Sequence, residues 1–258
     1  MDLADADRID RVLRRVEPDA LLHTAALSRV SVCERSPALA AILNEHAVST
    51  LARVCGSMRI RFLSTSTDLV FNGLQPPYTE SSPISPVNVY GESKAAGERE
   101  AVRFAGNSVI LRPALMYGAP AISGTSFSEW MRTEWRAGRA TPLYTDQYRT
   151  PVFVEDLAAA MLDLAEAKTR GIFHLAGPER INRLDFGRLL AERLGFGADL
   201  IRPVRMDEVK VPGKRPPDVS LCSERTEGPP AGKFSSCREG IRRAYTAGGE
   251  GFPPEDAG

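Results

Sequence analysis

The chain has 258 residues, of which 43% are hydrophobic and 26% are charged, as in an ordinary globular protein. Its 33 basic and 33 acidic residues cancel, so neither nucleic acid nor a membrane surface is expected as a partner. Four cysteines without Cys-x-x-Cys spacing predict a reduced protein, and no apolar run approaches the ~20 residues that cross a bilayer. We therefore expect a cytoplasmic protein, and we expect no metal site from its three scattered histidines.

Short apolar runs alternate along the chain with amphipathic segments. Strands are predicted at 20–23, 60–63, 108–111 and 172–175, and helices at 5–16, 37–55, 127–136, 154–165, 182–194 and 237–244. A further helix is predicted to begin through Ser85-Pro86, as an N-cap followed by a first-turn proline, and 146–150 reads as a polar loop. This alternation predicts an α/β protein with a parallel sheet.

The most informative stretch runs from residue 59 to residue 94. The strand at 60–63 ends in four consecutive hydroxyl residues at 64–67, and Tyr90 and Lys94 lie four apart on one face of the next helix. Ligands of parallel α/β sheets bind at the carboxyl ends of the strands. Hydroxyls there, facing a tyrosine and a lysine, suit proton delivery to a carbonyl group. The Tyr-x-x-x-Lys spacing alone would equally fit an amphipathic helix with an extended lysine side chain.

Several segments resemble a known superfamily. The runs STDLVFNG at 66–73, YGESK at 90–94 and LRPALMYG at 111–118 are similar to the extended short-chain dehydrogenases/reductases. The segments at 23–37, 146–158 and 171–187 resemble, more narrowly, the dTDP-4-dehydrorhamnose reductase branch. That branch is in turn similar to the regulatory β subunit of methionine adenosyltransferase. The resemblance extends from Asp2 to about Tyr245.

The resemblance implies a partial Rossmann-like parallel sheet with a small substrate-binding lobe. We expect the sheet domain at 1–175, with 119–150 contributing to the lobe, the lobe itself at 176–247, and a disordered tail at 248–258. Members of the superfamily open with a strand, a Gly-rich turn and a helix that holds the cofactor pyrophosphate. No such element is present here, so the sequence is expected to be truncated at its amino terminus, with the first strands of the sheet missing.

The resemblance also implies the site residues and the cofactor, NADP or NAD. Tyr90 would be the general acid, Lys94 would lower its phenol pKa and hold the nicotinamide ribose, and Thr67 would hydrogen-bond the substrate carbonyl. The cofactor would contact Asp2, Leu3, Ala25, Ala26, Ser66, Tyr90, Lys94 and Arg112. The substrate would contact Asp68, Gln147, Arg149 and Arg215. A buried Asn44 is expected to support the active-site strand.

The function expected from this set is reduction of a nucleotide-linked 4-keto sugar by NAD(P)H. Three alternatives stay open: an NADP-binding regulatory subunit that does no chemistry, a sugar-nucleotide epimerase or dehydratase, and an inactive fragment. A dehydratase usually has an acidic pair after the strand-end threonine, and here only Asp68 follows Thr67. The expected partners are a nucleotide sugar, a second copy of the chain and, under the regulatory alternative, a synthetase. The sequence does not decide the sugar, the nucleotide, or NAD against NADP.

Overall fold

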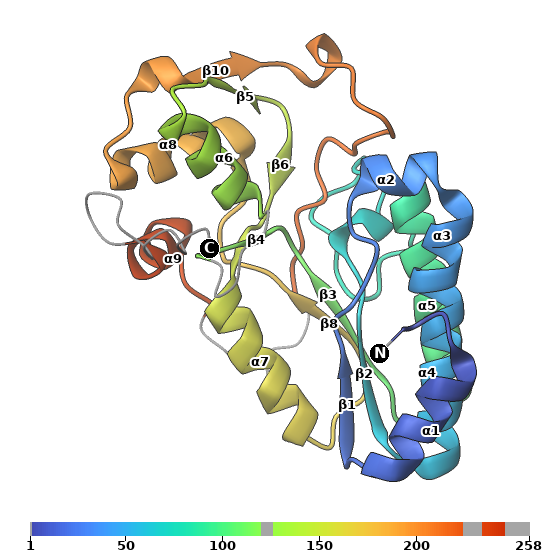
Figure 1. The fold of residues 1–258 in the computed structure, drawn as a ribbon. Helices are drawn as coiled ribbons and strands as arrows, with labels where there is room; N and C mark the ends of the chain where they lie inside the picture. Colours follow the sequence, from blue (N-terminus) through green and yellow to red (C-terminus); the bar gives the residue numbers. More distant parts are fainter. Residues whose placement is uncertain (1, 120–125, 224–233, 246–258) are drawn as a thin grey trace, which may run out of the picture.

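The computed structural model describes residues 2–119, 126–223 and 234–245. A four-stranded sheet forms its centre, with strands β1 (Ala20–His23), β2 (Arg61–Thr65), β3 (Val109–Pro113) and β8 (Gly171–Leu175). The order is β1-β2-β3-β8 and every neighbouring pair is parallel (Figure 1). The predicted α/β fold with a parallel sheet is therefore confirmed. Among the described strands β1 pairs only with β2, and the expected association with a second copy of the chain stays a prediction.

Helices cover both faces of the sheet. They are α1 (Ala6–Val16), α4 (Ala47–Met58), α5 (Val89–Phe104) and α7 (Val154–Glu166). Because successive strand residues point to opposite faces, Phe62 packs with α1, α4 and α5, while Leu63 packs with α7. The two layers lie on opposite sides of the sheet in Figure 1. Both faces are apolar, which explains why the strands read as short continuous apolar runs.

The segment predicted as one helix at 37–55 is more elaborate. After the short helix α2 (Val30–Arg35) come α3 (Pro37–Ala41), a π-helical segment (Ile42–His46) and α4. The backbone stays right-handed helical at Ala41, Ile42 and Ala47, so the chain turns continuously through the three parts. The π-helical segment holds the buried Asn44. Such segments are frequent at functional sites.

The start predicted for helix α5 is wrong. The helix begins at Val89 rather than near Ser85-Pro86, because Asn88 is its N-cap. The Asn88 Oδ1 accepts a hydrogen bond of 2.8 Å from the Gly91 N–H, which satisfies one of the free donors of the first turn. The backbone N–H of Ser85 instead bonds to the carbonyl of Val70.

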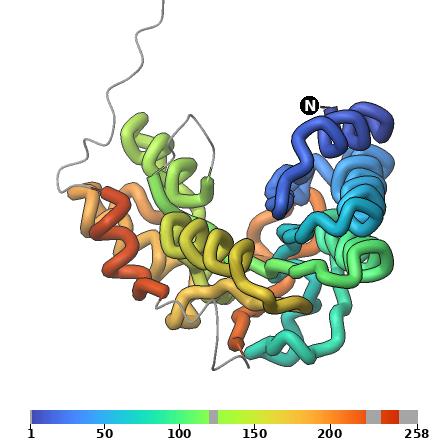
Figure 2. Tube along the Cα trace, turned by 90° about the horizontal axis from the view of Figure 1, so that it is seen from below, coloured from blue at the N-terminus to red at the C-terminus, as the bar shows by residue number. Residues whose placement is uncertain are grey.

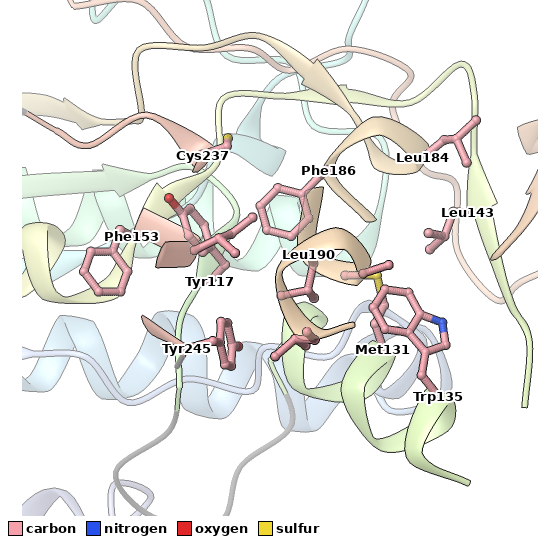
Figure 3. Close-up of a cluster of buried hydrophobic side chains, with 13 residues drawn as sticks. Tyr117, Met131, Trp135, Leu143, Phe153, Leu184, Phe186, Leu190, Cys237 and Tyr245 are labelled. Atoms are coloured by element: carbon pink, nitrogen blue, oxygen red, sulfur yellow. The ribbon is translucent and has the colours of Figure 1, made fainter. Parts of the chain in front are cut away.

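A second group of elements forms a lobe beside the sheet. It contains α6 (Phe127–Arg136), β5 (Thr141–Tyr144), α8 (Arg183–Leu194), β10 (Ile201–Val204) and α9 (Cys237–Ala244). In its core, Tyr117 lies against Phe186, and Met131 lies beside Trp135 (Figure 3). The predicted helices at 127–136, 182–194 and 237–244 are confirmed, with Asn182 as N-cap and Gly195 in a left-handed conformation after α8. Figure 2 shows these green, orange and red elements at one side of the molecule and the blue helices at the other.

Short strands connect the two parts. The strands β4 (Met116–Tyr117) and β7 (Val152–Phe153) are parallel, and β6 (Tyr148–Arg149) pairs antiparallel with β9 (Ile181–Asn182). The polar loop predicted at 146–150 therefore contains a strand. The pairing of β5 with β10 was also not predicted. These pairs bring polar residues of the lobe over the carboxyl ends of the sheet strands.

Part of the range expected for the lobe, around residues 219–221, packs instead on the sheet domain, against the loop after β2. Val219 and Leu221 pack with Phe71 and Tyr78 in the loop after β2, and Tyr78 and Leu221 form a parallel bridge. Short 3₁₀ turns occupy Asp68–Val70, Ala198–Leu200 and Met206–Glu208. In the described part of the chain, no helix combines the length and apolarity that crossing a membrane requires. The tail expected at 248–258 lies outside the described residues.

Candidate active site

A cavity of about 320 Å³ lies where the sheet meets the lobe. Its floor comes from the carboxyl ends of β1, β2 and β3, one wall from helix α5, and the opposite wall from the lobe. The residues that line it are Thr24, Ala26, Ser28, Val30, Thr65, Ser66, Thr67, Asp68, Leu69, Tyr90, Lys94, Pro113, Ala114, Leu115, Met116, Tyr144, Gln147, Arg149, Arg183 and Arg215. A ligand there would contact both parts of the molecule.

Thr67 and Tyr90 meet in this cavity. Thr67 follows β2 and caps the 3₁₀ turn that begins at Asp68, accepting a hydrogen bond of 3.1 Å from the Leu69 N–H. Burial raises the pKa of the Tyr90 phenol, and a hydrogen bond with Thr67 opposes this shift. The charge of Asp68 raises this pKa further, and the lowering expected from Lys94 stays a prediction. Tyr90 is thus protonated at neutral pH, as a general acid must be.

Lys94 places a cation at the same wall. The side chain is only 3% exposed, and its ammonium forms no hydrogen bond or ion pair with any described residue. Burial lowers the pKa of Lys94 to about 8, and the carboxylate of Glu98 opposes that shift. The ammonium therefore remains mostly protonated at pH 7 and is free to bind a group that enters the cavity.

The lobe side contributes three arginines to the cavity, and two of them lie near one carboxylate. The Nε of Arg149 lies 3.7 Å from the Asp68 Oδ2, and that oxygen has no hydrogen-bond partner among the described residues. Arg183 donates to the Gln147 Oε1 at 2.9 Å, while its buried Nη1 is without a hydrogen bond in the described chain. Burial and the charge of Arg149 lower the pKa of Arg183, although a guanidinium stays charged in proteins. With Arg215 this wall is strongly cationic.

Helix α5 is held in place by close backbone packing. A Cβ on Gly91 would lie 2.2 Å from the Leu69 carbonyl oxygen, and one on Gly97 would lie 2.4 Å from the Asn44 carbonyl oxygen. Asn44 donates to the Ser93 Oγ at 3.0 Å and bonds both backbone groups of Leu27. It therefore ties α5 to the loop after β1, rather than to the active-site strand as expected. Tyr90 and Lys94 are positioned by these contacts.

Most of the predicted site residues come together. Those that line the cavity are Ala26, Ser66, Thr67, Asp68, Tyr90, Lys94, Gln147, Arg149 and Arg215. Four do not line it, namely Asp2, Leu3, Ala25 and Arg112. Leu3 packs against the cluster under α1 and α4, and the Asp2 carboxylate accepts from the Ala4 N–H. Arg112 is 2% exposed and forms a buried pair with Glu98, so its guanidinium is already occupied.

Eleven of the lining residues were not predicted, among them the polar Thr24, Tyr144 and Arg183. Arg183 left a signal in the sequence. It is the first residue of α8, directly after the N-cap Asn182, and a cation there opposes the helix dipole. An arginine in such a position suits an anionic ligand, and its side chain lines the cavity. The described residues contain no group of three or more histidine, cysteine or acidic side chains that could hold a metal ion.

The comparisons with known proteins agree with this architecture. The chain is 32% identical over 231 residues to the "Probable low-salt glycan biosynthesis reductase Agl14" of Haloferax volcanii, covering 88% of this chain and 77% of that one. It is 29% identical over 248 residues to methionine adenosyltransferase 2 subunit beta of Xenopus laevis, covering 94% and 74%. The structure of dTDP-4-dehydrorhamnose reductase from Bacillus anthracis, in complex with NADP, superposes with a TM-score of 0.88 at 23% identity, covering 95% and 86%.

The family assignment rests on nearly the whole chain. The family described as RmlD substrate binding domain matches residues 1–248, which span the sheet, the cavity and the lobe. The chain therefore belongs to the RmlD substrate-binding domain family of extended short-chain dehydrogenases/reductases.

Proposed function

We propose that the protein reduces the ketone of a nucleotide-linked 4-keto sugar with NADPH or NADH. The observation that carries the proposal is the meeting of a protonated Tyr90, the Thr67 hydroxyl and the Lys94 ammonium in one cavity. These are an acid, a second hydrogen-bonding hydroxyl and a cation, which together suit proton delivery to a carbonyl oxygen. The similarity to a reductase of Haloferax volcanii and to dTDP-4-dehydrorhamnose reductases supports the same reaction class.

The residues of the cavity fit the nicotinamide end of such a cofactor, which supplies the hydride when it is bound. Lys94 presents an ammonium that no described residue pairs, and it would hold the ribose hydroxyls there. Ala26 is small, so a flat ring could approach the backbone at the end of β1. The Bacillus anthracis relative in complex with NADP supports the choice of cofactor class.

Residues of this chain would carry out the proton transfer of the reaction. The hydroxyls of Thr67 and Tyr90 would hydrogen-bond the carbonyl oxygen and stabilise the negative charge that develops on it. Tyr90 would then transfer its proton to that oxygen. Lys94, four residues along the same helix face, would stabilise the phenolate that remains. Because burial favours the neutral phenol, the phenolate would take up a new proton from solvent after each turnover.

The cationic wall supports a phosphate-bearing substrate. Arg149, Arg183 and Arg215 face a cavity in which Asp68 is the lining carboxylate among the described residues. Guanidinium groups bind phosphate oxygens with two parallel hydrogen bonds, which makes arginine the usual residue for such groups. We assign the three arginines to the diphosphate of a nucleotide sugar and the sugar itself to the space beside Thr67 and Tyr90.

Turnover by a Tyr90→Phe variant tests the proposal. The assay would follow oxidation of NADPH and of NADH, each at millimolar concentration, with a dTDP-4-keto sugar as substrate. Removing the phenolic proton should lower kcat by roughly 10²- to 10⁴-fold, with little change in thermal stability. Tyr148→Phe is the matched control, because Tyr148 lies outside the cavity and stacks under Arg180. A kcat within about twofold of the wild type for Tyr90→Phe would show that Tyr90 is not the acid.

A second candidate is favoured by the similarity to methionine adenosyltransferase β subunits. Under it, the chain would bind a dinucleotide and a synthetase without reducing a substrate. Fold does not separate the two functions, because one fold hosts both. Absence of keto-sugar turnover, together with co-purification of a methionine adenosyltransferase catalytic subunit, would favour the regulatory function over the proposed reductase.

A further inference from the structure

A buried charged cluster adjoins the cavity through Ser66, one of the residues that line it. It consists of Glu98 on α5, Arg112 on β3, His174 on β8 and Ser66 at the end of β2. The Arg112 guanidinium donates to both carboxylate oxygens of Glu98, at 2.9 and 2.8 Å. The Arg112 Nη1 lies 3.4 Å from the His174 Nε2. All four residues are at least nine-tenths buried.

Glu98 connects this cluster to the active-site wall. It follows Lys94 by four residues, so the two side chains share one face of α5. One carboxylate oxygen of Glu98 accepts hydrogen bonds from both Arg112 and the Ser66 hydroxyl. Ser66 directly precedes Thr67 and itself lines the cavity. A single carboxylate thus contacts the strand end that presents Thr67 and lies on the helix that presents Tyr90.

We propose that Glu98 is a positioning residue that keeps Lys94 protonated and fixes the end of β2 at the catalytic cavity. Without its carboxylate, Arg112 would be a buried cation without its ion-pair partner, and Lys94, one helical turn from position 98 on α5, would lose the nearby negative charge. A buried charge without a partner is costly, and it loses its proton where it can. Arg112 cannot deprotonate, so the loss would fall on Lys94.

The other groups around Lys94 cannot replace Glu98. His23, at the end of β1, is repelled by Lys94, and burial followed by that repulsion lowers its pKa to about 4, so it is neutral. Tyr90 on the same helix is protonated. Asp68 faces Arg149 and Arg183. Glu98 is the carboxylate that acts against the desolvation of Lys94.

The test is the proton affinity of Lys94, measured without cofactor or substrate. Brief acetylation at a series of pH values, followed by peptide mass spectrometry, reports the deprotonated fraction of each of the five lysines. In the wild type the reactivity of Lys94 should rise through a midpoint at about pH 8. In Glu98→Gln, which keeps the shape of the side chain, the proton affinity of Lys94 should fall by about tenfold or more.

Two further variants keep the test decisive. Glu92→Gln removes the same charge from an exposed position in the first turn of the same helix, and should leave the Lys94 midpoint unchanged. If Glu98→Gln alone does not fold, Glu98→Gln/Arg112→Met removes the unpaired guanidinium as well, and the Lys94 midpoint should still fall. A midpoint within about 0.3 of a pH unit of the wild type in the folded variant overturns the proposal.

The effect of Glu98 on catalysis rests on the proposed function, but its effect on the protonation of Lys94 does not. If the protein is a reductase, the pH at which kcat/KM declines should follow the shifted Lys94 midpoint in Glu98→Gln and stay unshifted in Glu92→Gln. A shifted Lys94 midpoint in a protein without turnover would defeat the proposed function and leave the role of Glu98 standing. Turnover by the protein, with a Lys94 midpoint that Glu98→Gln does not shift, would support the proposed function and refute the role of Glu98.

Discussion

Burial acts in opposite directions on the two ionisable groups that face each other across one helical turn of α5. It raises the pKa of Tyr90 and lowers that of Lys94, because a desolvated site disfavours the charged form of either group. The phenol therefore stays protonated at neutral pH, while Lys94 depends on Glu98 to stay charged. The same cavity thus keeps the Tyr90 phenol neutral and holds a Lys94 ammonium whose pKa is only about 8.

The buried Lys94 makes stability depend on pH. Its pKa in the folded protein, about 8, lies below the value of 10.5 for a free lysine, so between these values the unfolded chain binds a proton that the folded chain lacks. Stability contributed by this site therefore rises with pH across that window. Relative to Lys94→Met, the wild type should gain roughly 1–2 kcal/mol of unfolding free energy between pH 7.5 and 9.5. Urea denaturation at both pH values measures it, and a difference between the two proteins that stays flat with pH would refute it.

Residues fixed by local spacing were predictable from the sequence, and residues fixed by distant partners were not. Tyr90 and Lys94 are four apart on a helix, and Thr67 ends a strand, so their convergence followed from periodicity and from the position of ligand sites in parallel sheets. Arg112 was assigned to the cofactor because nothing local revealed its pairing with Glu98, 14 residues away. Arg183 was missed because its place in the cavity depends on how the lobe folds over the sheet.

At the scale of elements, helices with a clear cap were predicted nearly to the residue, while short strands were not. Helices α6 and α9 have the predicted bounds, because each combines an amphipathic pattern with a capping serine. Strands β6 and β9 are two residues long and form only by pairing with each other. Such a strand has no periodicity of its own. The π-helical segment likewise leaves no periodic signal, since it continues a helix.

The position of α5 depends on a glycine. Adding a methyl group at Gly97 would bring a carbon to 2.4 Å from the carbonyl oxygen of Asn44, so α5 would have to move away from the π-helical segment. We expect Gly97→Ala to destabilise the fold by roughly 1–3 kcal/mol, although alanine is the better helix former by about 1 kcal/mol. Denaturant unfolding measures this loss.

Gly106→Ala is the matched control for the packing of α5. Gly106 lies just beyond the end of the helix, and a Cβ there meets no atom within 4 Å. Its substitution should change stability by less than about 0.5 kcal/mol. If Gly97→Ala were as stable as Gly106→Ala, α5 would not be held by close backbone packing, and the placement of Tyr90 and Lys94 would need another cause.

The whole molecule joins a parallel sheet to a lobe, and the two parts bring different chemistry to the cavity. The sheet and α5 supply the hydroxyls, the phenol and the ammonium. The lobe side supplies Gln147, Arg149, Arg183 and Arg215. The sheet could be predicted because strand and helix periods alternate, whereas the wall of arginines depends on the pairing of β6 with β9. The groups proposed to bind phosphate therefore belong to the lobe side, the part of the fold that was least predictable from the sequence.

This division predicts different affinities for two diphosphate ligands. A dinucleotide pyrophosphate is usually held by the N–H groups of a Gly-rich turn at a helix amino terminus, and in the part of the chain that the structure describes no Gly-rich turn joins a strand to a helix. We therefore expect this chain to bind NADPH with a Kd above ~100 µM, or about −5.5 kcal/mol. The diphosphate of dTDP has the three arginines instead, and should bind more tightly than NADPH.

Calorimetric titration of the wild type and of Arg215→Gln with dTDP and with NADPH tests this difference. Arg215 lines the cavity and lies on the lobe side, so its loss should weaken dTDP binding by about tenfold, the effect of one charge-assisted hydrogen bond. It should leave the weak NADPH binding unchanged, because the nicotinamide end is held by Lys94 on the opposite wall. Micromolar binding of NADPH by the wild type would contradict the first expectation. Equal binding of dTDP by both proteins would show that the arginine wall does not recognise the diphosphate.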